Sequence, residues 1–227
     1  MNLTRISSLL LLLAATNGSS ADWIEPFNGK DLEDWDGAPG LWRVENGTIV
    51  GETTDRSLKH HSYLIWHGGK LKDFELRLQF RVPGRHGNSG VQYRSRDLGN
   101  HQVAGYQCNI HPRKTGSTAV LEEMKNGRGG HLADIGKKIE IKDGDIRTVI
   151  GSTGNPEKIN GSLKRNDWND LVIRAEGNRL RHWLNGHLAV DVLDNDTKAA
   201  SEGVLALQVH SGPPMRVEFR NIRLRKR

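Results

Sequence analysis

A strict alternation of apolar and polar residues is the feature that most constrains this chain. Residues 74–81 alternate without a break, so an extended strand would carry four apolar side chains on one side and four polar ones on the other. Residues 91–94, 106–111, 205–210 and 217–222 repeat the pattern. Long stretches with the 3.6-residue spacing of an amphipathic helix are missing. The chain is therefore expected to be almost entirely β.

Glycine and asparagine separate the alternating segments. Glu176-Gly177-Asn178 joins residues 171–175 to residues 181–184 as a predicted hairpin, and Asn185-Gly186 is a two-residue turn signal. Short strands at regular spacing predict an antiparallel sandwich or jelly roll. Residues 116–160 are rich in Gly, Lys, Asp and Glu. We expect them to form a long excursion with a few short strands.

The first residues have the pattern of an export signal. Arg5 precedes an apolar run of about ten residues, too short to span a bilayer, and small residues follow it. A buried N-terminal helix is the competing interpretation. We expect residues 1–21 to be a signal peptide and residues 22–227 a single jelly-roll domain, exported to the periplasm or secreted. No later segment predicts a membrane span.

The cysteine count and the charge narrow the functional classes. Cys108 is the only cysteine, so no internal disulfide is expected, and a buried place in a strand suits it best. The net charge is +6 and the isoelectric point is near 9.5. The basic residues are dispersed, however, and nucleic acid is not a predicted partner.

The polar sides of the strands share an unusual composition. Solvated strands favour Lys, Glu and Thr, whereas here Arg, Gln, Asn and His dominate, and their planar groups form directional hydrogen bonds. An ordinary hydrated sheet face is the competing interpretation. The pattern predicts a face that binds the hydroxyl groups of a carbohydrate. Its expected members are Arg77, Gln79, Arg81, Gln92, Arg94, Gln107, Asn109, His111, Gln208 and His210.

Two carboxylates and one loop arginine lie in the excursion. Glu122 and Glu123 are adjacent, so in a strand only one of them would face the sugar, and apolar neighbours could raise its pKa. Arg128 lies in a Gly-rich loop that could close over a ligand or be solvated. The histidines lack metal-site spacing, so no metal site and no cofactor are predicted, with a divalent metal left open.

The order of short motifs resembles the 3-keto-disaccharide hydrolase family, also described as a 3-keto-glucoside 1,2-lyase and 3-keto-2-hydroxy-glucal hydratase domain. The motifs include Phe27-Asn28-Gly29-Lys30-Asp31-Leu32, Trp42-Arg43-Val44-Glu45-Asn46-Gly47, Gly87-Asn88-Ser89-Gly90-Val91-Gln92-Tyr93-Arg94, Gly105-Tyr106-Gln107, Leu207-Gln208-Val209-His210 and Phe219-Arg220-Asn221-Ile222. The resemblance covers nearly all of residues 22–227. Asn109 stands where a similar branch has an acid, and Val120-Leu121 also departs from the pattern.

The resemblance implies a concanavalin A-like or laminin-G-like jelly roll and a β-elimination. A ketone at C3 acidifies the C2 hydrogen, a base removes it, and the C1–O bond then breaks. Glu122 or Glu123 is the candidate base, His210 the candidate acid, and Arg94 the clamp on the enolate, with Arg81 behind it. The expected sugar-binding residues are Asn88, Gln92, Gln107, Asn109, His111, Arg128 and Gln208.

Three functions remain open on this sequence. The first is cleavage of 3-keto-glycosides by elimination followed by hydration. The second is a non-catalytic carbohydrate-binding module of the same fold, which the loss of an acid at Asn109 favours. The third is a scaffold in a larger exported complex. The expected partner is a small-molecule or oligosaccharide substrate, and the sequence predicts no oligomeric state.

Overall fold

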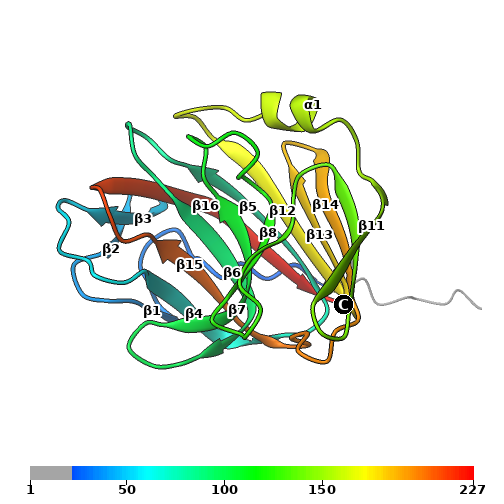
Figure 1. Cartoon of the computed structure of the whole chain (residues 1–227). Helices are drawn as coiled ribbons and strands as arrows, with labels where there is room; N and C mark the ends of the chain where they lie inside the picture. The colour runs from blue at the N-terminus through cyan, green and yellow to red at the C-terminus, as the bar shows by residue number, and fades with distance from the viewer. Residues whose placement is uncertain (1–21) are drawn as a thin grey trace, which may run out of the picture.

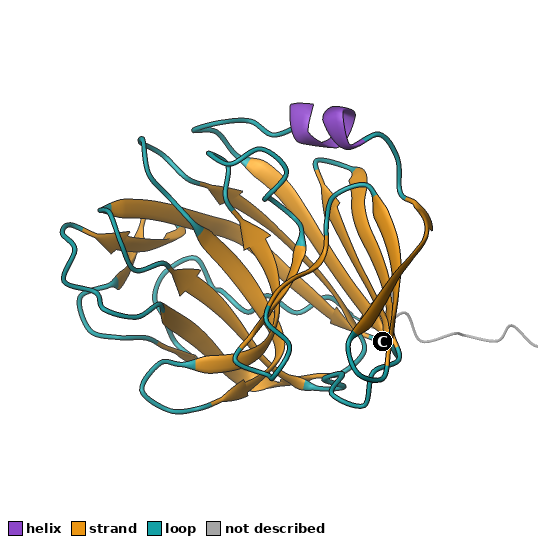
Figure 2. Ribbon diagram, viewed as in Figure 1, coloured by secondary structure: helices purple, strands orange, loops and turns teal. Residues whose placement is uncertain are grey.

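The computed structural model describes residues 22–227 as two β-sheets packed face to face with one short helix (Figures 1 and 2). This is the predicted all-β jelly-roll sandwich. Its sheets contain seven and nine strands. The predicted signal peptide, residues 1–21, lies outside the described residues and stays a prediction. Within the described part of the chain, no helix has the length and apolar character needed to cross a membrane.

The seven-stranded sheet has the order β1-β4-β15-β6-β7-β8-β9, and its neighbours are all antiparallel. Its strands are β1 (Trp35–Asp36), β4 (Ser62–Leu71), β15 (Gly203–Val209), β6 (Ser89–Asp97), β7 (Val103–Ile110), β8 (Leu121–Met124) and β9 (Gly130–Ala133). Because β6 runs against β7 and β15, its first residue lies beside the last residues of those two strands. This end of the sheet carries the candidate site.

The nine-stranded sheet has the order β11-β10-β14-β13-β12-β5-β16-β3-β2. Its strands are β11 (Ile146–Ser152), β10 (Lys137–Lys142), β14 (His187–Asp194), β13 (Arg179–Leu184), β12 (Asn169–Glu176), β5 (Phe74–Arg81), β16 (Met215–Lys226), β3 (Thr48–Thr53) and β2 (Trp42–Glu45). Strands β10 and β14 are parallel, and the remaining pairs are antiparallel. The predicted hairpin is the β12–β13 pair.

The core lies between the sheets and follows the alternation. The apolar side chains of β5 are buried and face those of the opposite sheet, such as Tyr93, Tyr106 and Leu207. Cys108 is fully buried on β7, as predicted, and burial raises the pKa of its thiol. A thiolate nucleophile is therefore disfavoured at this position.

The excursion forms short strands that pass from one sheet to the other. It comprises β8 and β9 in the seven-stranded sheet, β10 and β11 in the nine-stranded sheet, and α1 (Pro156–Gly161). In Figure 1, α1 lies above the ends of β12, β13 and β14. The prediction of an excursion with a few short strands is confirmed.

The outer face of the nine-stranded sheet is lined by ion pairs and aromatic rings. We call it the charged face, defined by Glu75, Arg77 and Arg81 of β5 together with their neighbours on β12, β13 and β16. Glu75 is completely buried there and pairs with four guanidiniums, those of Arg77, Arg174, Arg225 and Arg227. Three tryptophans each lie beneath two arginines. The stacks are Trp23 with Arg77 and Arg225, Trp168 with Arg81 and Arg220, and Trp183 with Arg174 and Arg181.

Candidate functional site

The outer face of the seven-stranded sheet gathers most of the predicted amides. We call it the polar face, defined by Gln92 of β6, Gln107 and Asn109 of β7, Glu122 of β8 and Gln208 of β15. Gln107 lies opposite Gln92 on one neighbouring strand and opposite Glu122 on the other. Gln92, Gln107, Asn109 and Gln208 therefore share one face, as predicted, and of the two candidate carboxylates it is Glu122 that joins them.

The amides of the polar face are buried and bonded in a directional chain. The Ser95 hydroxyl donates to Gln92 Oε1, Gln92 Nε2 donates to Gln107 Oε1 at 2.8 Å, and Gln107 Nε2 donates to Glu122 Oε2 at 3.1 Å. Gln92 and Gln107 are at most 2% exposed. A sugar cannot reach these two side chains directly, so they act as a layer that orients the carboxylate of Glu122.

Gly90 makes this packing possible. It faces outward on β6 next to Gln107, and the Gln107 side chain lies across its backbone. A Cβ at residue 90 would come within 2.5 Å of Gln107 Cδ, which is closer than atoms pack. The absent side chain of Gly90 is what allows Gln107 to reach both Gln92 and Glu122.

Asn109 is only 3% exposed, and its side chain binds the backbone of a neighbouring loop. Its Nδ2 donates to the carbonyl oxygen of Ser117 at 2.7 Å, and its Oδ1 accepts from Gln107. A carboxylate at this position could not donate to that carbonyl. Asn109 thus fixes the loop of residues 111–117 above the end of β7, and it is a positioning residue.

Glu122 is the most chemically promising acid of the polar face. Its Oε1 lies 2.7 Å from His131 Nε2, and His131 Nδ1 lies 3.2 Å from Asp134 Oδ1. Burial raises the pKa of Glu122, while His131 and Gln107 oppose that rise. The carboxylate keeps some contact with solvent, since its side chain is 15% exposed.

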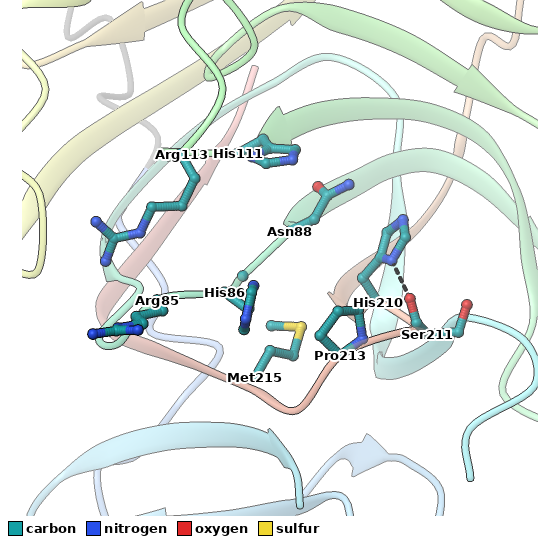
Figure 3. Close-up of a pocket in the computed structure, with 10 residues that line it drawn as sticks. Arg85, His86, Asn88, His111, Arg113, His210, Ser211, Pro213 and Met215 are labelled. Atoms are coloured by element: carbon teal, nitrogen blue, oxygen red, sulfur yellow. Dashed lines mark hydrogen bonds between the residues drawn. The ribbon is translucent and has the colours of Figure 1, made fainter. Parts of the chain in front are cut away.

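A cavity of about 210 Å³ opens at the end of this face, where β6 begins and β7 and β15 end. Three predicted site residues, Asn88, His111 and His210, line it. The full lining is Arg85, His86, Gly87, Asn88, His111, Arg113, His210, Ser211, Pro213 and Met215. Figure 3 shows Asn88, His111 and His210 along one side and the guanidinium groups of Arg85 and Arg113 on the other.

His210 is held by its neighbours in a defined orientation. Its Nδ1 lies 2.5 Å from the carbonyl oxygen of Ser211 (Figure 3), and its ring packs against that of His61, with centroids 3.9 Å apart and the planes tilted by 37°. A carbonyl only accepts, so Nδ1 carries the proton and the neutral ring keeps a lone pair at Nε2. His61 Nδ1 accepts from the Ser211 N–H at 3.1 Å. Burial and the neighbouring His210 lower the pKa of His61 to about 4, so His61 is neutral at pH 7.

Two further polar atoms at the cavity have no partner in the described structure. They are Asn88 Oδ1 and His111 Nδ1, and both are buried. Burial also lowers the pKa of His111, which favours its neutral form. Buried polar atoms in proteins are usually bonded, so this pair marks a place prepared for a ligand.

Arginines supply the positive charge of the cavity. Arg113 donates to the carbonyl oxygen of Gly84 and to Asn166 Oδ1, which fixes its position, while Arg85 is exposed. Among the described residues, none that lines the cavity is acidic. The cavity thus combines three imidazoles with two guanidiniums that no carboxylate of its lining neutralises.

Arg94 was predicted on the polar face, and this placement is wrong. Strand β6 has a bulge between Tyr93 and Arg96, and Arg94 has a positive φ of 46°. The bulge interrupts the alternation and turns the side chain away. Its guanidinium donates to the carbonyl oxygens of Lys72 and Gly177 at 2.8 Å and contacts Asp73. Arg94 is a buried brace between loops.

Glu123 and Arg128 are also away from the predicted site, on the inner side of β8. Arg128 binds Glu123 at 2.6 Å and Asp194 at 2.8 Å, and the Tyr106 hydroxyl donates to Asp194 at 2.5 Å. The side chains of Glu123 and Arg128 are fully buried. The expectation that Arg128 closes over a ligand is therefore wrong, because this buried ion triad fixes its loop to β14.

The placement of Arg81, and with it Arg77 and Gln79 of the same strand, and the predicted acid–base pair need correction too. Arg81 lies on the charged face of the other sheet, where it binds Glu218 and stacks on Trp168. Glu122 and His210 lie on the same face but at different heights along the strands. Glu122 is in register with Gln107, Gln92 and Ala206, and Ala206 of β15 comes four residues before His210. At about 3.3 Å per residue, the two positions are roughly 13 Å apart along the strand direction. One sugar carbon pair cannot contact both.

Sequence reasoning missed four residues of the cavity region, namely His61, Arg85, His86 and Arg113. All four lie in loops at strand ends, where alternation gives no information about direction. Their clustered basic and imidazole side chains near the Gly87-Asn88 and His111 motifs were the available signal. Among residues 22–227, no group of three or more His, Cys, Asp or Glu side chains is arranged to hold a metal ion.

Residues 22–225 match the family described as the 3-keto-alpha-glucoside-1,2-lyase-like domain. The chain belongs to this family. The match covers nearly all of the described residues, and it confirms the resemblance seen in the motifs. Among curated proteins, none matches the sequence significantly.

Solved structures with the same fold include both a binder and an enzyme. Carbohydrate-binding module CBM66 from Bacillus subtilis is 18% identical, with a TM-score of 0.57, covering 85% of this chain and 96% of that one. The Bacillus licheniformis β-glucanase is 11% identical, with a TM-score of 0.56, covering 92% of this chain and 100% of that one. At these identities the likeness shows the fold alone.

Proposed function

We propose that this lyase-like domain cleaves 3-keto-glycosides, and that the reaction takes place in the cavity lined by His111 and His210. The observation that carries the proposal is the cavity itself. It offers imidazoles, a buried amide oxygen without a partner, and guanidiniums that no lining carboxylate neutralises, around a space of about 210 Å³. These are the groups that proton abstraction next to a ketone needs.

The chemistry follows from the ketone. A base takes the C2 hydrogen, and the electron pair moves into an enolate at the C3 oxygen. The enolate collapses to a C1–C2 double bond as the C1–O bond breaks, and the departing oxygen takes up a proton. Water then adds at C1 and a proton returns to C2, so that the net result is hydrolysis.

His210 is the base in this scheme. Its Nδ1 proton is held by the Ser211 carbonyl, which leaves the Nε2 lone pair free to accept the C2 hydrogen. This reverses the acid role expected from the sequence, since a neutral ring oriented in this way has no second proton to give. Packing against His61 restricts the ring to one orientation.

Asn88 and His111 stabilise the enolate. A neutral imidazole can donate a hydrogen bond to a ketone oxygen, and lowering the pKa of His111 keeps it in that form. The amide of Asn88 supplies a second donor from the same side of the cavity. Arg85 and Arg113 add a positive field across the cavity.

In this scheme the protein is exported through residues 1–21.

Turnover of 3-keto-trehalose in D₂O tests the proposal. Proton abstraction alone places deuterium at C2, and elimination releases glucose, so nuclear magnetic resonance reports the two steps separately. Wild-type protein is expected to do both. His210→Gln is expected to lose both, while Arg96→Gln, an exposed change at the far end of β6, keeps them. Absence of exchange and of release in the wild type would overturn the assignment.

A second candidate is sugar binding without turnover. The observation that favours it is the lack of an acidic residue among the described residues of the cavity lining. In that case calorimetry would detect a glycoside bound at the cavity, and the binding would weaken in Asn88→Ala, but C2 exchange would be absent. The exchange experiment therefore decides between the two candidates.

A further inference from the structure

Most arginines of the described residues form an ion pair with a carboxylate, and the two arginines at the cavity belong to the minority that do not. On the charged face, Arg77, Arg174, Arg225 and Arg227 surround Glu75. In the described structure neither Arg85 nor Arg113 contacts an acidic residue, and Arg113 is bound only by a carbonyl and an amide oxygen. Moreover, Arg113 Nε is buried without a partner.

The cavity has two chemically different sides. Figure 3 shows His111, His210 and Asn88 on one side and the two guanidiniums on the other, with His86 next to Arg85. The reacting C1–C2–C3 edge of a keto sugar belongs at the imidazoles. In a pyranose ring C5 lies directly across from C2, so the substituent on C5 is directed toward the guanidiniums.

From this arrangement we infer that the cavity prefers a glycoside with a negative charge at C6, either a uronate carboxylate or a 6-sulfate, which Arg85 and Arg113 bind. The inference rests on the proposed function for the orientation of the ring. A guanidinium fork matches the geometry of a carboxylate or sulfate, and a neutral C6 hydroxyl would leave the charge uncompensated.

Binding of unoxidised sugars tests the charge preference without turnover. The probes are methyl α-glucopyranoside, its uronic acid and its 6-sulfate, with affinities measured by calorimetry at low and moderate salt. We expect the charged probes to bind roughly tenfold or more tightly than the neutral one, because hydrogen bonds between charged groups are stronger. The ratio of carboxylate to sulfate affinity identifies which anion the fork accepts.

Variants then locate the effect. Arg85→Gln and Arg113→Gln are expected to bring the charged and neutral probes to within about twofold of each other. Arg96→Gln, on the same strand as Gln92 but far from the cavity, is the matched control and should keep the preference. Arg113 also holds its loop, so Arg113→Lys and a thermal melt separate loss of charge from loss of the loop.

Turnover of the 3-keto forms keeps the two proposals apart. If neutral and charged 3-keto-glycosides are cleaved equally and the probes bind equally, the charge inference fails and the proposed function stands. If the charged probes bind more tightly but no 3-keto sugar is cleaved, the function fails and the anion site stands. Charge preference that persists in both Arg85→Gln and Arg113→Gln overturns the assignment to these arginines.

Discussion

The two outer faces of the sandwich carry similar types of polar side chain, but the two faces differ in how completely those side chains are paired. On the charged face, each guanidinium of the Glu75 cluster has a carboxylate partner, and tryptophans cover several of them. On the polar face and at its cavity, three buried polar atoms of amides and imidazoles lack partners, namely Asn88 Oδ1, His111 Nδ1 and Gln208 Oε1. The charged face also leaves the Nε atoms of Arg174, Arg181 and Arg225 without partners, but each of these guanidiniums is otherwise ion-paired. The two faces therefore differ in that these three unpartnered atoms of the polar face and its cavity belong to amide and imidazole groups that have no ion pair.

Replacing His210 should have the largest effect, and only on chemistry. His210→Gln removes the base, so kcat for a 3-keto-glycoside should fall by about 10²–10⁴. Thermal stability should change little, because the ring is partly exposed. Glu122→Gln is the informative comparison, since Glu122 lies on the same face but about four residues away from His210 along the strands. A larger loss in Glu122→Gln than in His210→Gln would move the site to the amide chain.

Replacing Glu75 should produce the opposite result, a loss of stability with chemistry retained. Glu75→Gln leaves four guanidiniums around a buried neutral amide, and the free energy of unfolding should fall by about 3 kcal/mol. Urea denaturation measures this, and kcat per folded molecule should stay unchanged. A change in kcat would show that the two faces are coupled.

Acid should reproduce the Glu75 effect. Burial acts to raise the pKa of Glu75, but its arginine partners outweigh burial and hold that pKa at about 2, below the ordinary value of 4.5. A pKa lowered on folding stabilises the protein above the ordinary value and not below the lowered one. Stability should therefore fall from pH 4.5 to pH 2, and Glu75→Gln should flatten the curve. Identical curves for both proteins would contradict this account.

Gly90→Ala tests the amide chain under the polar face. The new Cβ would press on Gln107, and the overcrowding should cost about 2 kcal/mol in the free energy of unfolding. Because Gln107 orients Glu122 and Asn109, the loop that carries His111 should shift and KM should rise. Gly161→Ala, at a glycine with open space around it and no positive φ, gives the matched comparison without crowding. Equal effects of the two changes would argue against crowding at Gln107.

Removing one arginine from a cation–aromatic stack of the charged face should have the smallest effect on stability. Arg220→Gln removes one of two guanidiniums over Trp168 and should lower stability by about 0.5–1 kcal/mol, with no effect on turnover. Differential scanning calorimetry of Arg220→Gln and Trp168→Leu measures the stack from both sides. A loss as large as that in Glu75→Gln would mean that stacking, rather than ion pairing, maintains this face.

The alternation predicted the fold and the common face of Gln92, Gln107, Asn109 and Gln208. It was wrong for Arg94, because one bulge residue reverses the side on which the following side chains lie. It could not separate Arg81 from these residues, because period two assigns a side of a strand but not the sheet to which the strand belongs. The directions of Arg85 and Arg113 depend on loop contacts that bring distant segments together.

The buried triad of Arg128, Glu123 and Asp194 affects how fast the chain unfolds. Arg128 lies in the loop between β8 and β9 of one sheet, and Asp194, 66 residues later, lies on β14 of the other, so their bond forms only after both sheets have met. Interactions that form after the folding transition state change mainly the unfolding rate. We expect Arg128→Met to accelerate unfolding while refolding keeps its rate, so the triad sets the lifetime of the native state.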